Sequence, residues 1–113
     1  MLARPNRLTR GADYKAVVRR GRRCAAAHTV SYVSTRAEAA TAPPRFGFIV
    51  SKKVGTAVVR NTVRRRLKAV CAEALASVRP GTDVVIRALP SSANAAYSEL
   101  RAEISRCLAR SAA

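Results

Sequence analysis

The residues best placed to do chemistry are the basic side chains in the middle of the chain. No acid lies between Glu38 and Glu73, and the whole chain carries 22 lysines and arginines against 6 acids, a net charge of +16. On a helix with about 100° per residue, five polar residues of this interval fall within one arc of roughly 140°. They are Arg60, Asn61, Arg64, Arg65 and Lys68. A row of guanidinium and ammonium groups suits phosphate, so the sequence predicts a surface that binds nucleic acid.

Two lysines before this row and one arginine beside it extend the predicted surface. Lys52 and Lys53 stand at the junction of a predicted strand and the predicted helix, where the helix dipole also favours phosphate. Arg66 falls on the other flank of the helix's apolar stripe. Like charges at i and i+4 weaken an isolated helix, which indicates a polyanionic partner. The alternatives are a basic face open to water and a charged turn at Lys52 and Lys53, although water-exposed faces normally mix both signs.

The other polar residues form no recognisable catalytic or metal site. His28 is the one histidine, and no suitable carboxylate is near it in sequence. The chain shows no Ser/His/Asp arrangement, no paired carboxylates and no glycine-rich phosphate loop. A protein that cleaves RNA with its own metal ions needs clustered acids, whereas these six are scattered. We therefore expect no catalytic residue, metal ligand or cofactor on the protein itself.

Cysteine usage indicates a reducing compartment. Cys24, Cys71 and Cys107 are odd in number and far apart, and no CxxC pair occurs. Neither a zinc site nor a disulfide framework is therefore predicted. Cys71 and Cys107 fall on apolar helix faces and are expected to be small core residues. The pattern is typical of a cytoplasmic protein.

Length and hydropathy predict one folded domain over residues 1–113. The hydrophobic fraction is 49% and the mean hydropathy is −0.05, which is enough apolar material for one modest core. No stretch approaches the ~20 apolar residues of a membrane span, and residues 1–10 contain no apolar run like that of a signal peptide. We expect no membrane partner, and we expect flexible ends at residues 1–9 and 110–113.

The elements that position the basic row follow from periodicity. Apolar residues with helical spacing predict helices at 12–20 and 57–78, with Thr56 as the N-cap of the second, and a last helix after Pro90. Alternating and β-branched residues predict strands. These are 28–34, 45–51 and 83–89, with a weaker strand at 22–26 and a connection at 37–44. The order α-β-β-(β)-α-β-α predicts an α+β fold, a two-layer α/β sandwich with a small mixed sheet of about four strands.

The combination of these motifs resembles the bacterial ribonuclease P protein family. The resemblance covers roughly residues 6–108, and its most specific part runs from the strand end at Ser51 through the basic helix. The matching pieces are Asn6-Arg7-Leu8, Asp13-Tyr14, Arg45-Phe46-Gly47, Ser51-Lys52-Lys53-Val54-Gly55, Ala57-Val58-Val59-Arg60-Asn61, Val63-Arg64-Arg65-Arg66-Leu67 and Asp83-Val84-Val85-Ile86-Arg87-Ala88.

The resemblance implies a fold and two RNA partners. The family fold has a left-handed crossover through the central helix, and the protein binds a catalytic RNA that removes the 5′ leader from precursor tRNA. The RNA and its Mg²⁺ ions do the chemistry, and no protein partner is implied. The family's Arg-Asn-Arg motif falls on Arg60, Asn61 and Thr62, so Thr62 departs from the pattern.

The resemblance also implies a cleft for the single-stranded leader between the first helix and the sheet. The matching positions are Tyr14, Val18 and Tyr32. Aromatic rings stack on RNA bases, but ordinary core packing is the alternative for both tyrosines. Charge alone does not separate this function from that of a structural or regulatory RNA-binding protein, such as a ribosomal protein.

Overall fold

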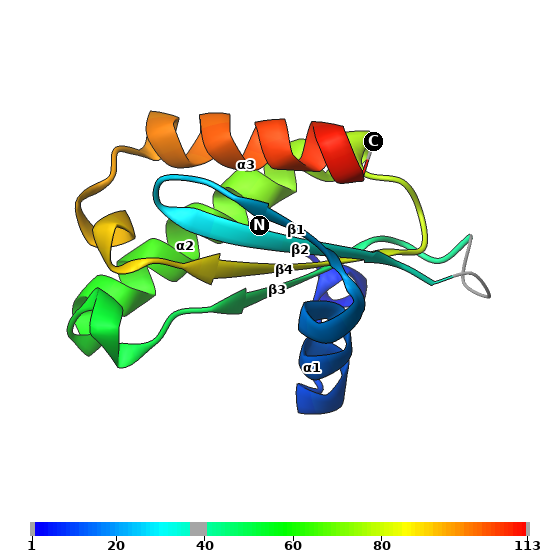
Figure 1. Ribbon diagram of the computed structural model, residues 1–113, viewed down its shortest axis with the longest axis horizontal. Coiled ribbons are helices and arrows are strands. Elements are labelled where there is room, and N and C mark those ends of the chain that lie inside the picture. Colours follow the sequence, from blue (N-terminus) through cyan, green and yellow to red (C-terminus); the bar gives the residue numbers. More distant parts are fainter. Residues whose placement is uncertain (1, 37–40, 113) are drawn as a thin grey trace.

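A computed structural model describes residues 2–36 and 41–112, and within these ranges the chain forms three α-helices and four strands (Figure 1). The predicted connection at 37–44 is described only from residue 41. Short 3-10 turns occur at Arg4–Asn6, Lys52–Val54, Leu75–Ser77 and Pro90–Asn94. The helices are α1 (Gly11–Arg20), α2 (Ala57–Ala74) and α3 (Tyr97–Ser111), and the strands are β1 (Arg22–Ala25), β2 (Thr29–Thr35), β3 (Arg45–Ile49) and β4 (Thr82–Ala88).

The strands form one mixed sheet in the order β1-β2-β4-β3. β1 pairs with β2 and β2 pairs with β4 in antiparallel fashion, whereas β3 and β4 are parallel and are connected through α2. α2 and α3 cover one face of the sheet, and α1 crosses the other face (Figure 1). The predicted α+β fold with about four strands is confirmed, and the weak early strand is β1.

Alternation along the strands divides the core into two clusters. On the α2 and α3 side, Phe46, Val84 and Ile86 point toward Leu67 and Ile104. The alternate positions form the core under α1 with the helix and the N-terminal segment. This second cluster contains Leu8, Val17, Val30, Tyr32 and Val85. Burial of these apolar side chains is the main favourable free energy that fixes both helix layers on the sheet.

The ends of the chain, which are expected to be flexible at residues 1–9 and 110–113, make packing contacts at several positions within residues 2–9 and 110–112. Leu2 and Leu8 are buried, and the side-chain amide of Asn6 donates to the Pro44 carbonyl over 2.9 Å. At the other end, α3 continues to Ser111 and Ala112 is fully buried. Composition suggested loose ends because it does not show that β3 offers an edge to the N-terminal segment.

The helix predicted at 57–78 is shorter in the structure. α2 ends at Ala74 and a 3-10 turn continues to Ser77, so the last predicted turn is tighter than an α-helix. The predicted N-cap is confirmed, because the Thr56 hydroxyl accepts a hydrogen bond from the Val59 N–H.

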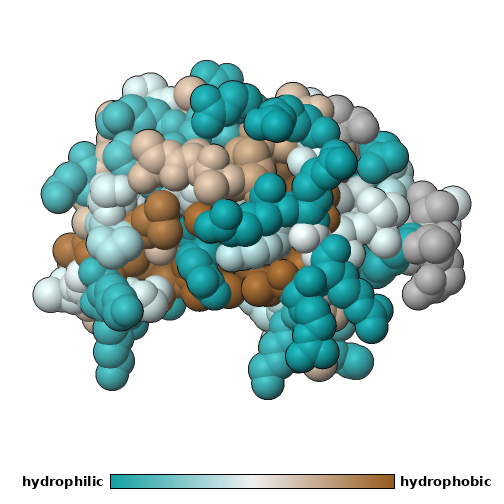
Figure 2. Space-filling model, viewed as in Figure 1, coloured by the Kyte–Doolittle hydropathy of each residue, from teal (hydrophilic) through white to brown (hydrophobic). Residues whose placement is uncertain are grey.

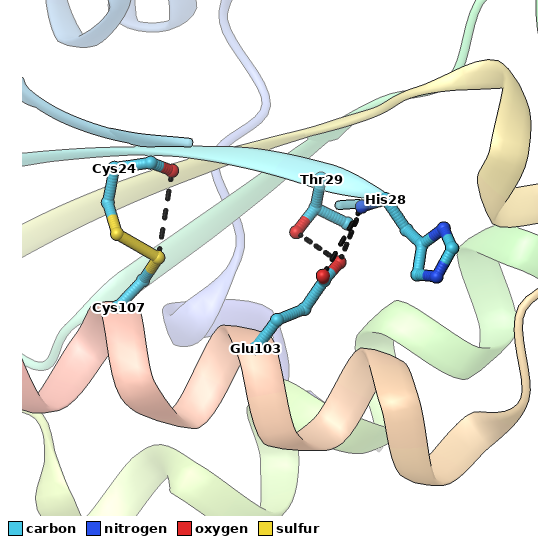
Figure 3. Close-up of a disulfide and its surroundings, with 5 residues drawn as sticks. All are labelled: Cys24, His28, Thr29, Glu103 and Cys107. Carbon is cyan, nitrogen blue, oxygen red and sulfur yellow. Dashed lines mark hydrogen bonds between the residues drawn. A yellow bond between two sulfur atoms is a disulfide. The ribbon is translucent and has the colours of Figure 1, made fainter. Parts of the chain in front are cut away.

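Two cysteines that were predicted to be free form a disulfide. Cys24 of β1 and Cys107 of α3 are bonded, with their Cα atoms 5.8 Å apart (Figure 3). Their 83-residue separation conceals the contact, because only the packing of α3 against the β1 side of the sheet brings them together. Cys71 is the free and fully buried cysteine of the described chain, as predicted, and burial raises the pKa of its thiol.

Candidate nucleic-acid interface

The predicted basic row lies on the exposed side of α2. Asn61, Arg65 and Lys68 are exposed, and Arg60 and Arg64 are half-buried. The opposite side of the helix is buried through its apolar stripe, which fixes the direction in which the row points. The buried stripe consists of Val63, Leu67, Val70 and Cys71.

Internal hydrogen bonds order part of this row. The Arg64 guanidinium donates to the Asn61 side-chain oxygen over 3.2 Å and to the Val50 carbonyl over 3.5 Å. The Nε of Arg60 is shielded from solvent and has no acceptor among the described atoms. A shielded cationic donor without an acceptor is unfavourable alone, so it suits a partner that brings oxygen atoms.

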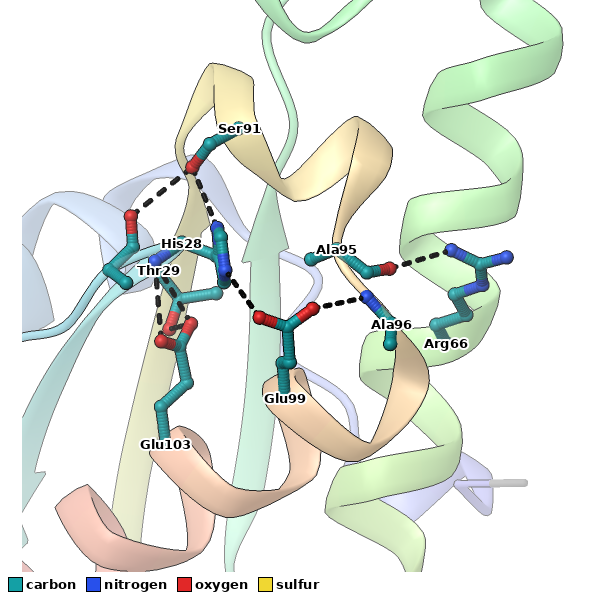
Figure 4. Close-up of polar contacts among 9 residues, drawn as sticks. His28, Thr29, Arg66, Ser91, Ala95, Ala96, Glu99 and Glu103 are labelled. Carbon is teal, nitrogen blue, oxygen red and sulfur yellow. Dashed lines mark hydrogen bonds and ion pairs between the residues drawn. The ribbon is translucent and has the colours of Figure 1, made fainter.

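The neighbouring predicted residues fall into two groups. Lys52 and Lys53 are exposed on a 3-10 turn that buried Val54 holds in place, directly before α2. Arg66 points away from the row and donates to the Ala95 carbonyl over 3.2 Å, so it ties α2 to the turn before α3 (Figure 4). Thr62 donates to the Val58 carbonyl over 3.1 Å. Its hydroxyl therefore serves the helix backbone.

A second surface is the hollow between α1 and the sheet, with a volume of about 490 Å³. In the space-filling view, hydrophobic residues are visible on the lower side of the molecule, beside the hydrophilic projection that α1 forms (Figure 2). The hollow combines apolar and cationic side chains. It is lined by Tyr14, Lys15, Val18 and Arg19 of α1, Ile49 of β3 and Arg87 of β4.

Tyr14 is held firmly in this hollow. Its hydroxyl accepts from the Phe48 N–H over 3.2 Å and donates to the Leu8 carbonyl over 3.3 Å. Its ring lies on Gly47, where an added Cβ would come within 2.5 Å of the ring. Glycine in the Arg45-Phe46-Gly47 motif therefore makes room for the tyrosine.

Tyr14 also lines a second hollow that leads to the basic row. This hollow, about 370 Å³, lies between the N-terminal segment, β3 and α2. Arg64 and Lys68 of the row form part of its wall together with Tyr14. The row on α2 and the α1 hollow are thus neighbours on either side of one aromatic ring.

The structure places the other two predicted cleft residues differently from each other. Val18 lines the α1 hollow, whereas Tyr32 is only 8% exposed and packs in the core beneath α1.

Four residues that line the α1 hollow were not predicted from the sequence. They are Lys15, Arg19, Ile49 and Arg87. For Ile49 and Arg87 the signal is the strand alternation, since both share a sheet face with Tyr32.

Buried charge fixes α1 against the sheet. Arg45 binds Asp83 with two hydrogen bonds of 2.9 and 2.8 Å and lies 3.7 Å from Asp13 of α1. The hydrogen bond to Asp83 raises the pKa of the Arg45 guanidinium further. The Nε atom of Arg36 lies 3.1 Å from the buried Asp83 carboxylate and forms an ion pair with it, although the geometry is not that of a hydrogen bond. These paired charges connect α1 to the start of β3 and β4.

The structure corrects the view that His28 stands alone. Its ring lies 2.8 Å from the Ser91 hydroxyl and 3.4 Å from the Glu99 carboxylate (Figure 4). The Ser91 hydroxyl donates to the Ala27 carbonyl, so its proton is not directed at the imidazole as in a serine nucleophile. These contacts could not be seen in the sequence, because Ser91 and Glu99 follow His28 by 63 and 71 positions.

The group formed by His28, Ser91 and Glu99 has a structural role, as the hydrogen bonds of the adjacent Glu103 show. Buried Glu103 accepts hydrogen bonds from the main-chain N–H of His28 and from the Thr29 hydroxyl (Figure 3). Glu99 accepts from the Ala96 N–H, and this bond followed by the contact with His28 lowers the pKa of Glu99. The cluster thus clamps the start of β2 to the first turns of α3. Within residues 2–36 and 41–112, no group of three or more His, Cys, Asp or Glu is arranged to hold a metal ion.

No helix of the described residues is long and apolar enough to cross a membrane.

Comparisons with known sequences agree on one family. The family model "Ribonuclease P" matches residues 2–112. The ribonuclease P protein component of Clavibacter michiganensis is 56% identical over 110 residues, covering 97% of this chain and 96% of the relative. That of Acidothermus cellulolyticus is 46% identical, covering 97% and 91%.

Solved structures share the fold at lower identity. The RNase P protein of Staphylococcus aureus superposes with a TM-score of 0.81 at 22% identity, covering 91% of this chain and 92% of that one. The RNase P protein of Thermotoga maritima gives a TM-score of 0.79 at 18% identity, covering 92% and 96%. These likenesses concern the arrangement of the helices and strands.

Proposed function

Because the chain belongs to the ribonuclease P protein family, the protein subunit of the endoribonuclease that processes tRNA, we propose that it holds two RNAs at once. The basic row on α2 binds the catalytic RNA. The hollow beside α1 binds the single-stranded 5′ leader of precursor tRNA, whose removal gives the mature 5′ end.

The row on α2 fits a structured RNA. Its exposed cations project from a rigid helix and can contact successive phosphates, and Asn61 can add a hydrogen bond to a sugar or base. Lys52 and Lys53 lengthen the same surface beyond the helix N-terminus. Thr62 stands where the family motif has a second arginine, so Arg64 and Arg65 supply the guanidinium groups on this side.

The α1 hollow fits a single strand. Val18 and Ile49 offer an apolar floor for bases, and three cations at its rim can follow a phosphate backbone. These cations are Lys15, Arg19 and Arg87. With Tyr32 in the core, the aromatic contact falls to Tyr14, and stacking on one ring contributes about 1–3 kcal/mol per base.

The observation that carries the proposal is the position of Tyr14. It lines both the α1 hollow and the hollow that Arg64 and Lys68 share, so a leader in the first lies next to an RNA docked on the second. In this arrangement the protein positions the substrate, and the RNA performs the cleavage with Mg²⁺ ions that the RNA holds.

The test compares two affinities of the reconstituted holoenzyme, one for precursor tRNA and one for mature tRNA. The variant Lys15→Ala/Arg87→Ala removes one exposed cation from each wall of the α1 hollow. We expect precursor affinity to fall by roughly tenfold, as two exposed charge pairs would give, and mature-tRNA affinity to stay unchanged. The matched control Arg79→Ala/Arg101→Ala removes two exposed cations elsewhere and should change neither affinity.

Parallel losses for precursor and mature tRNA would contradict the leader site. Equal binding of both RNAs by the unmodified holoenzyme would do so as well, because the leader would then contribute nothing.

A further inference from the structure

A third basic surface lies at the β1 edge of the sheet, away from α2. Here β1 and the end of α3 enclose a narrow hollow of about 370 Å³. Arg22 and Arg23 form one wall, and Arg110 and Ser111 form the other. We refer to this place as the edge hollow.

Within residues 2–36 and 41–112, the arginines of the edge hollow form no ion pair with an acid. Among the residues that the structure describes, the ion pairs involve other cations, namely His28, Arg36, Arg45 and Arg101. Three like charges around one concave surface repel each other, so the site favours an anionic ligand.

The two walls of the edge hollow are joined covalently. The disulfide between Cys24 and Cys107 joins β1 to α3, and Cys24 itself lines the hollow. A hollow of about 370 Å³ between a strand and a helix can hold part of a single phosphate backbone.

The edge hollow and the α1 hollow lie on opposite faces of the sheet, and Arg23 lies between them at the β1 edge. Cys24 points toward α3, whereas Arg23 pairs with Tyr32 and shares its α1-facing side. Arg19 lines the α1 hollow, and Arg23 of the edge hollow follows it by four residues. The two side chains are therefore anchored at most ~14 Å apart along the chain. At about 3.4 Å per stacked nucleotide, roughly four nucleotides of single-stranded RNA span that distance.

We infer that the edge hollow binds the phosphate backbone of the leader upstream of the nucleotides held beside α1. This inference rests on the proposed function and extends it, because it assigns a second leader contact that depends on leader length. A short leader ends within the α1 hollow, whereas a leader longer by about four nucleotides or more reaches Arg22, Arg23 and Arg110.

The experiment measures holoenzyme affinity for mature tRNA and for two precursors, one with a short and one with a long leader. The variant Arg23→Ala/Arg110→Ala removes one cation from each wall, and both side chains are exposed, so folding should be preserved. We expect roughly tenfold weaker binding of the long-leader precursor and unchanged binding of the short-leader precursor. The slope of log K against log salt should fall by about 1.4 for the long leader only, about 0.7 for each lost contact with a single strand.

Two further variants sharpen the result. Arg23→Lys/Arg110→Lys keeps the charges and should retain most of the affinity for the long leader. Arg79→Ala/Arg101→Ala is the matched loss of charge elsewhere and should leave both precursors unaffected.

Equal losses for the two leaders, or no loss for the long one, would overturn the inference. Weaker binding of the catalytic RNA alone would also overturn it, because the edge hollow would then contact that RNA. If the wild-type holoenzyme binds neither precursor more tightly than mature tRNA, the leader site beside α1 is refuted. The proposed leader contact at the edge hollow is then refuted as well, because it depends on that site.

Discussion

Reduction of the Cys24–Cys107 disulfide should destabilise the protein strongly without changing its amino-acid sequence. The bond links an edge strand to the last helix across 83 residues, and both cysteines are buried. Reduction adds two electrons and two protons and gives two thiols. Cys71 does not compete for the bond near neutral pH, because burial raises the pKa of its thiol and keeps it protonated.

The size of the effect follows from the length of the closed loop. A cross-link over 83 residues lowers the entropy of the unfolded chain enough to stabilise the fold by about 4.5 kcal/mol. That is a large share of the roughly 5–15 kcal/mol by which small domains are stable. It corresponds to a decrease in Tm of about 20 °C for a domain of this size.

The assay is urea unfolding of the oxidised protein, the reduced protein and the variant Cys24→Ala/Cys107→Ala. Titration of thiols in denaturant should find one free thiol before reduction and three after it. We expect the reduced protein and the variant to unfold at similar, lower urea concentrations. Cys71→Ala serves as the control, since it should keep the full difference between its oxidised and reduced forms.

Coincident unfolding curves for oxidised and reduced protein would refute this reasoning. So would three reactive thiols in the protein before reduction, because they would mean that the bond does not form.

Three further predictions concern RNA. Affinity for the catalytic RNA should fall steeply with salt, with a slope of log K against log salt near −4 if about five phosphates are contacted; a flat response would exclude an electrostatic row. Arg60→Glu/Arg65→Glu should weaken that affinity by about 100-fold, and Arg79→Glu/Arg101→Glu far less, whereas equal losses would indicate diffuse charge. The isolated protein with Mg²⁺ should leave precursor tRNA intact in a cleavage assay. Cleavage that survives removal of RNA but is lost when acids of the protein are replaced would contradict the assignment of catalysis to the RNA.

The elements of the fold could be predicted because their signals are local. The spacing of Tyr14, Val17 and Val18 is enough for α1, and Thr56 marks the start of α2. The side of the sheet that a helix covers is not a local property. Strand alternation places Ile49 and Arg87 on one face, but only the packed structure shows that this face is the one α1 crosses.

The candidate site was predictable where it lies on one helix. The row from Arg60 to Lys68 follows from helical geometry, and so does the separate direction of Arg66. Contacts between distant segments were not predictable. Tyr32 is buried because Leu8 and Val17 cover it, and neither residue is near it in sequence.

The two edges of the sheet are protected by different means. Arg7 bridges to Phe46 and covers β3 with the N-terminal segment, whereas β1 keeps an open edge that bears exposed Arg22 and Arg23. An open edge is a template for pairing with a second chain, and clustered positive charge opposes such pairing. Neutralising these arginines should therefore increase self-association. Light scattering at the protein concentrations of the binding assays would reveal it.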